Sequence, residues 1–192
     1  MHPMQSEPLG QLRTVAAPER PGLGIRDLVL LAILLAAGFI LNFTAGKAIA
    51  AVSGGAIAPE FIIAAFCLTI LIVRPTIPQS LVIGFISAAV IQLTTTAPGI
   101  DFIAESLAAI AMATIVQAGA PGCLRALVPA VGTFVATLIS GTVFVVIKMM
   151  LMGFATQIAL VMLPVVTATS LFNAVLVCAL YPPVKAALAL EE

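Results

Sequence analysis

The chain has 192 residues, of which 62% are hydrophobic and only 8% are charged, and its mean hydropathy is +1.24. Because an average soluble domain carries about 25% charged residues, this composition excludes a soluble enzyme and indicates an integral membrane protein. Eight basic and eight acidic residues give a formal net charge of zero, so global charge points to no nucleic-acid partner.

Residues 1–26 hold four prolines and no apolar run, and they are interpreted as a flexible cytoplasmic tail. A bilayer core of about 30 Å needs roughly 20 apolar residues per helix, so the length allows about six spans. We therefore expect one all-α transmembrane domain over 27–187 and a C-terminal tail over 188–192. The predicted apolar segments are 27–46, 59–73, 77–97, 100–119, 127–150 and 164–181.

Two connections between the predicted helices have distinctive compositions. The second apolar segment is short for a span, which predicts a helix that either does not span fully or begins inside the protein. The glycine-rich stretch before it, KAIAAVSGGAIAP, predicts a loop that folds over a site as a lid. Between the last two helices, LMGFATQIALVM predicts an interfacial turn of helix.

Basic residues are distributed unevenly between the predicted helix ends. Six helices place both termini on one side of the membrane, and the side richer in Lys and Arg is cytoplasmic. With the N-terminus inside, only Lys47 and Lys148 lie outside. Both termini are therefore predicted to be cytoplasmic, in a multi-pass protein of the cell membrane. The basic residues expected inside are Arg13, Arg20, Arg26, Arg74, Arg125 and Lys185.

Patterns typical of metal binding or catalysis are scarce. The only histidine is His2, and the cysteines Cys67, Cys123 and Cys178 stand singly in or beside apolar segments, where they are interpreted as small buried hydrophobic residues. The predicted helices contain no GxSxG motif and no paired aspartates. We expect no metal, no cofactor and no enzymatic activity in this chain.

Three acids, Glu60, Asp101 and Glu105, fall in the predicted outer half of the bundle. Pro98-Gly99 is predicted to end the third helix and begin the fourth, which places Asp101 and Glu105 four residues apart on one face. One interpretation is that these acids only complement helix dipoles at a wet interface. The other is a functional site, because acids inside transmembrane segments usually have a function.

Other polar side chains extend this candidate site. Lys148 is either a snorkelling anchor or a counter-ion, and the threonine run at 94–96 either bonds back to helix carbonyls or lines the site. Neutral amides in apolar helices each need a partner or a ligand. Carboxylates that hold an ammonium, with a lysine or a helix N-terminus that holds a carboxylate, suit an amino acid with a large apolar side chain. The candidate substrate-binding residues are Glu60, Gln92, Thr96, Asp101, Glu105, Lys148 and Asn173.

The first predicted helix carries two small residues, Ala32 and Ala36, four apart within LLAILLAAGFILN. Small residues at this spacing allow another helix to approach closely. The spacing is explained equally by packing within the chain and by docking on a partner.

Three stretches are similar to a known family: APEFIIAAFCLTIL, SLVIGFISAAVIQLTTTAPG, and LPVVTATSLFNAVL followed by LYPPVK. From about residue 31 to 185 the chain resembles the substrate-binding S components of energy-coupling factor (ECF) transporters, in particular the tryptophan-type S components. Glu60 and Glu105 match positions where that type has acids. The turn after Gly99 departs from the family, with Ile100-Asp101 in place of a turn rich in glycine and amides.

The resemblance implies a six-helix bundle that binds its solute from outside, beneath a lid made by the first loop. Such a subunit has no ATPase of its own. It docks on a transmembrane T component through small residues, here Ala32 and Ala36, and two cytoplasmic ATPases use ATP to drive uptake as an ABC importer. The implied solute is tryptophan or a related aromatic amino acid.

Two alternatives stay open: an S component for another vitamin-like or amino-acid solute, and a self-contained membrane carrier of small solutes. An intramembrane enzyme is disfavoured because the helices lack an activated nucleophile or a metal site. A channel is disfavoured because the inner halves of the helices are apolar.

Overall fold

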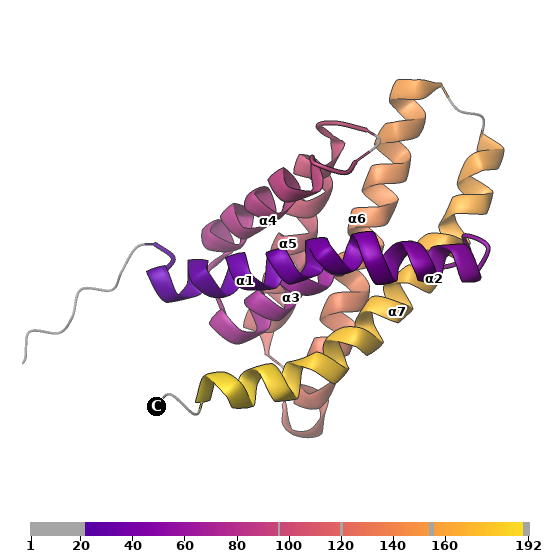
Figure 1. Ribbon diagram of the computed structural model, residues 1–192. Helices are drawn as coiled ribbons and strands as arrows, with labels where there is room; N and C mark the ends of the chain where they lie inside the picture. Colours follow the sequence, from indigo (N-terminus) through magenta and orange to yellow (C-terminus); the bar gives the residue numbers. More distant parts are fainter. Residues whose placement is uncertain (1–21, 96, 120, 154–155, 190–192) are drawn as a thin grey trace, which may run out of the picture.

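The computed structural model describes residues 22–95, 97–119, 121–153 and 156–189, and every regular element in them is helical (Figure 1). The predicted C-terminal tail and most of the N-terminal tail lie largely outside these residues, as does Thr96. The elements are α1 (Ile25–Leu41), η1 (Asn42–Gly46), α2 (Lys47–Val52), α3 (Phe61–Val73), α4 (Ile77–Ile91), α5 (Ile100–Ala118), η2 (Gly122–Leu127), α6 (Val128–Met152) and α7 (Thr156–Ala189).

Four helical stretches are long and apolar enough to cross a membrane, counted over the described part of the chain. Helices α3 and α4 are apolar but shorter, so the prediction of a short second helix is confirmed. The chain is therefore an all-helical membrane protein. The four long stretches are Ile25–Val52, Ile100–Ala118, Arg125–Leu151 and Leu160–Leu188.

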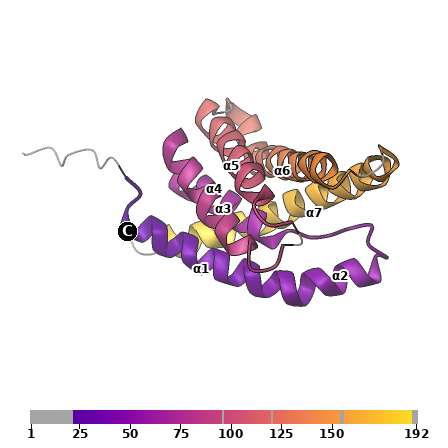
Figure 2. The same ribbon diagram turned by 90° about the horizontal axis from the view of Figure 1, so that it is seen from above.

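Helices α1 and α2 form one continuous rod, joined by the π-helical turn η1 (Figure 2). The first predicted segment ended at residue 46, whereas the structure continues the helix to Val52. Lys47–Val52, with the sequence KAIAAV, is rich in alanine, the strongest helix former. The predicted glycine-rich loop is thus shorter than expected and begins at Ser53.

The helix boundaries differ from the predictions at two other places. Helix α4 ends at Ile91, and residues 92–94 that follow form turns rather than a last helical turn. Helix α7 extends well beyond the predicted 164–181 at both ends, although it contains prolines at 164, 182 and 183. Transmembrane helices tolerate proline where neighbouring groups satisfy the freed backbone atoms.

Helix α3 is the centre of the bundle. Every residue from Phe61 to Leu71 is buried, and the helix contacts α1, α4, α5, α6 and α7. A helix that is apolar all round belongs in a protein interior. By contrast, the surrounding helices expose large apolar residues such as Ile33, Phe85 and Val175, as expected of a surface that faces lipid.

Two long-range hydrogen bonds fix one end of the bundle. Arg26 Nη2 donates to the carbonyl of Leu188 at 3.4 Å, and Gln117 Nε2 donates to the carbonyl of Pro75 at 2.8 Å. The first bond joins the start of α1 to the end of α7, and the second joins the α3–α4 connection to the end of α5. Two lysines, Lys47 and Lys148, lie towards the opposite end. The basic residues at the shared end are Arg26, Arg74, Arg125 and Lys185.

Helices α4 and α5 pack backbone against backbone at Gly84. A Cβ atom at this position would lie 2.8 Å from the carbonyl oxygen of Glu105 and 2.9 Å from the Cα of Ser106. Because both atoms belong to the α5 main chain, only a shift of the whole helix would make room. The glycine therefore sets the separation of α4 and α5.

We expect Gly84→Ala to lower the free energy of unfolding by about 1–3 kcal/mol, because forced repacking outweighs the better helix propensity of alanine. Denaturant unfolding in detergent, followed by circular dichroism, measures the change. Gly22→Ala is the control, since no atom lies within 4 Å of its Cβ position. Equal stability of the two variants would contradict the close approach.

Candidate ligand-binding cavity

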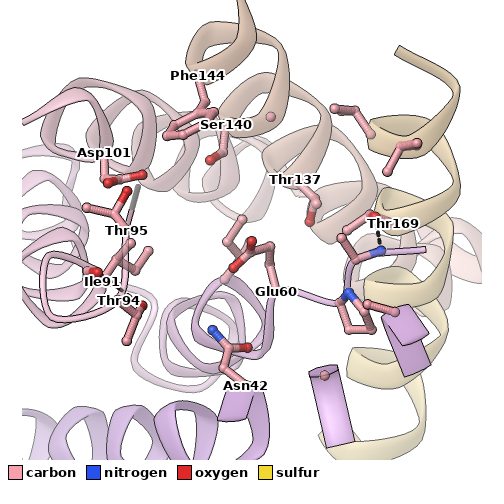
Figure 3. A pocket seen from close by; sticks show the side chains of 18 of the residues that line it. Asn42, Glu60, Ile91, Thr94, Thr95, Asp101, Thr137, Ser140, Phe144 and Thr169 are labelled. Atoms are coloured by element: carbon pink, nitrogen blue, oxygen red, sulfur yellow. Dashed lines mark hydrogen bonds between the residues drawn. The ribbon is translucent and has the colours of Figure 1, made fainter. Parts of the chain in front are cut away.

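A cavity of about 590 Å³ lies towards the end of the bundle that is remote from the start of α1. Small-molecule sites typically occupy about 300–1,000 Å³. Figure 3 shows polar side chains arranged around a common space, with Asp101 and Thr95 on one side, Thr169 on the other and Glu60 between them. The walls come from η1, α2, α3, the turn after α4, α5, α6 and α7.

The non-helical segment that leads into α3 forms the floor of the cavity and positions Glu60. Thr169 Oγ1 accepts a hydrogen bond from the N–H of Ala58 at 3.1 Å. Asn173 Nδ2 donates to the carbonyl of Glu60 at 3.2 Å, and Asn42 Oδ1 accepts from the N–H of Phe61 at 2.8 Å. Side chains of α7 and η1 thus replace the helical hydrogen bonds that this segment lacks.

Asp101 is held in the first turn of α5 by neutral donors. Gln92 Nε2 donates to Asp101 Oδ2 at 3.2 Å, while Gln92 Oε1 accepts from the N–H of Gly99 at 3.0 Å. The Thr95 side chain lies beside Asp101 (Figure 3). Gly99 begins the helix with a φ of 89°, a conformation that favours glycine. The predicted start of a helix directly after Pro98-Gly99 is confirmed.

Glu105 lies one turn further along α5 and is only 3% exposed. Its Oε1 accepts a hydrogen bond from Ser140 Oγ at 2.8 Å. Its Oε2 is buried and has no hydrogen-bond partner among the described residues. An unsatisfied buried acceptor is costly, and more so when charged, so this carboxylate would gain from a ligand that brings a donor into the cavity that it lines.

Two lysines stand at different distances from the cavity. Lys47 lines it, with Nζ 4.6 Å from the ring centroid of Phe43, which also lines it. Lys148 does not line the cavity; its Nζ lies 5.3 Å from the ring centroid of Phe144, which does. Lys148 still acts electrostatically on Asp101. It therefore offsets part of the negative charge of Asp101 from outside the cavity lining.

The structure divides the predicted substrate-binding residues into three groups. Those that line the cavity are Glu60, Asp101 and Glu105. Those that contact or act on lining residues from outside are Gln92, Lys148 and Asn173. The remaining one, Thr96, lies outside the described residues. The expected common face of Asp101 and Glu105 is confirmed, since both are buried and reach the same cavity.

Several cavity residues were missed in the sequence. On α6, Thr133, Thr137 and Ser140 recur at intervals of four and three, which places them along one face of an apolar helix. Thr137 and Ser140 line the cavity, and Thr133 is buried. This polar stripe was a readable signal. The role of Asn42 was not, because its partner in α3 is known only from the fold.

No protein-family model, curated protein or solved structure matches this chain. Within the described ranges, no group of three or more His, Cys, Asp or Glu side chains could hold a metal ion. The function therefore has to be inferred from the cavity. Its apolar walls, convergent carboxylates and single lining lysine are suited to binding a small amphipathic molecule.

We expect Asn42→Ala to destabilise the protein by about 1–3 kcal/mol, because the N–H of buried Phe61 loses its acceptor. Unfolding in detergent measures the loss. Thr44→Val is the control from the same helical turn: its hydroxyl bonds only back to Ile40, so the change should stay within about 0.5 kcal/mol. A control as damaging as Asn42→Ala would show that the turn itself, not the amide, is responsible.

Proposed function

We propose that this chain is the substrate-binding S component of an ECF-type importer, and that it captures tryptophan or a related aromatic amino acid from outside the cell. The observation that carries the proposal is the cavity near one end of the bundle. Its aromatic and aliphatic walls suit a large apolar side chain, its carboxylates suit an ammonium, and Lys47 suits a carboxylate.

A six-span, multi-pass arrangement in the plasma membrane is part of the proposal. Helix α3 has 13 residues, which at 1.5 Å per residue gives about 20 Å, less than a bilayer core of about 30 Å. The segment before α3 and the cavity occupy the remaining depth on the outer side. The end that carries Arg26, Arg74 and Lys185 would then face the cytoplasm, with both termini, because basic residues favour that side.

Uptake would require partners: a transmembrane T component and two cytoplasmic ATPases that hydrolyse ATP, with no cofactor in this chain. The exposed face of α1 supports a docking surface for the T component. Ala32 and Ala36 are both exposed on it, and their small side chains allow a partner helix to approach closely.

Binding of tryptophan is directly measurable, since the chain contains no Trp and Tyr181 is its only tyrosine. We expect added tryptophan to show a saturable change of fluorescence with the purified protein. Ala50→Phe, which narrows the cavity, should weaken binding by at least about tenfold, or 1.4 kcal/mol. Ala48→Phe is the matched control on the same helix, because residue 48 is exposed and does not line the cavity.

Absence of a saturable signal would contradict an aromatic amino acid as the solute. Co-purification of a different small molecule would then favour the alternative, an S component for another vitamin-like or amino-acid solute.

The docking proposal predicts a separation of binding from transport. Ala32→Leu with Ala36→Leu should reduce uptake in cells by at least about tenfold, while the purified variant keeps its ligand affinity. Ala37→Leu, on a neighbouring exposed face of α1, is the control and should leave both unchanged. Unchanged uptake in the double variant would favour a self-contained carrier.

A further inference from the structure

The charges that line the cavity are out of balance. Three carboxylates, those of Glu60, Asp101 and Glu105, reach it, against one ammonium, that of Lys47. The three acids act electrostatically on one another across the space. Like charges gathered in a medium of low dielectric repel strongly, so the empty cavity favours the entry of a positive group.

Neutral groups supply the hydrogen bonds that the structure defines for these carboxylates. Asp101 is bonded by Gln92, and Glu105 by Ser140. Amides and hydroxyls orient a carboxylate but leave its charge in place. Lys148 offsets part of the charge of Asp101. A ligand cation would supply the counter-charge that an ionised Glu60 or Glu105 needs in a buried site.

Within the described part of the chain, Glu105 lacks a hydrogen-bond donor at one of its two carboxylate oxygens, Oε2. The side chain is 97% buried and lines the cavity, and this oxygen has no donor among the described residues. A ligand hydroxyl would supply a hydrogen bond but no charge, whereas an ammonium supplies both. A carboxylate in this position therefore favours an ammonium over a neutral donor.

A ligand carboxylate has a poorer place in the same cavity. Among the described residues, Lys47 is the one cation that lines it, and this lysine is exposed and already lies over the Phe43 ring. Attraction by an exposed cation is weak because water screens it, and the ring competes for it. Meanwhile three acids repel the carboxylate.

We propose that the ammonium group of the solute is the group that this cavity chiefly recognises: the nitrogen pairs with the carboxylate of Glu105, and an amine binds more tightly than the corresponding amino acid. This inference rests on the proposed function, capture of a small solute that carries an ammonium group, and identifies which of its groups the cavity selects. It assigns the discriminating contact to one carboxylate, so it can be tested with ligands that differ only in charge.

Tryptamine, tryptophan and indole-3-propionate share a ring and a two-carbon chain and carry charges of about +1, 0 and −1 at neutral pH. Their affinities for the purified protein in lipid vesicles can be compared by fluorescence, with empty vesicles as the baseline for partitioning. We expect tryptamine to bind at least about tenfold more tightly than tryptophan, and indole-3-propionate to bind most weakly. Tighter binding of tryptophan or of the acid would overturn the proposal.

Substitutions of the acidic residues test which carboxylate contacts the ligand nitrogen. Glu105→Gln keeps the shape and the bond to Ser140 but removes the charge, so it should weaken tryptamine by at least about tenfold without weakening indole-3-propionate. Asp101→Asn serves as a second test if Glu105→Gln does not fold. Asp27→Asn is the matched control, because Asp27 bonds Gly24 at the opposite end of the bundle and should leave all three affinities unchanged.

The outcomes separate the two proposals. Tryptophan that binds tightly and is taken up, in preference to tryptamine, would leave the importer intact and overturn the selectivity for cations. Failure of all three compounds to bind would reject both proposals for an indole-bearing solute. Tryptamine binding that neither Glu105→Gln nor Asp101→Asn changes would overturn the assignment of the nitrogen to this carboxylate.

Discussion

The rest of the structure depends on one constraint: backbone polar groups at membrane depth must all be hydrogen-bonded within the protein. Helix α3 is too short to satisfy this alone, since the extended segment that leads into it lacks helical partners. Thr169, Asn173 and Asn42 supply the missing donors and acceptors. These polar side chains therefore have a structural role. The space next to the start of α3 forms the cavity.

The acidic side chains of the cavity have a different role from these structural amides and hydroxyls. Gln92 and Ser140 orient the carboxylates of Asp101 and Glu105 but bring no counter-charge, so ionising these acids costs stability in the empty protein. Buried charges are more readily explained as determinants of specificity than as stabilising contacts. The bundle is held together elsewhere, by the apolar α3 and by close contacts such as that of Gly84 with α5.

Composition and local sequence patterns predicted the features of this fold that depend on residues close together in the sequence. Helical content, the short α3 and the start of α5 after Gly99 follow from hydropathy and from turn residues. The continuation of α1 into α2 was missed because two glycines after Val52 suggested an earlier break. Asn173 and Glu60, whose contact spans 113 positions, could not be paired before the helices were placed.

Gly84 also bears on the chemistry of the cavity, although it lies outside it. The α5 atom nearest to its missing side chain is the carbonyl oxygen of Glu105 itself. A methyl group there would displace the backbone that carries the Glu105 carboxylate. The position at which this carboxylate contacts a ligand nitrogen would then change. Evolution could thus retune the preferred ligand length from the far side of the helix, with every residue of the cavity wall unaltered.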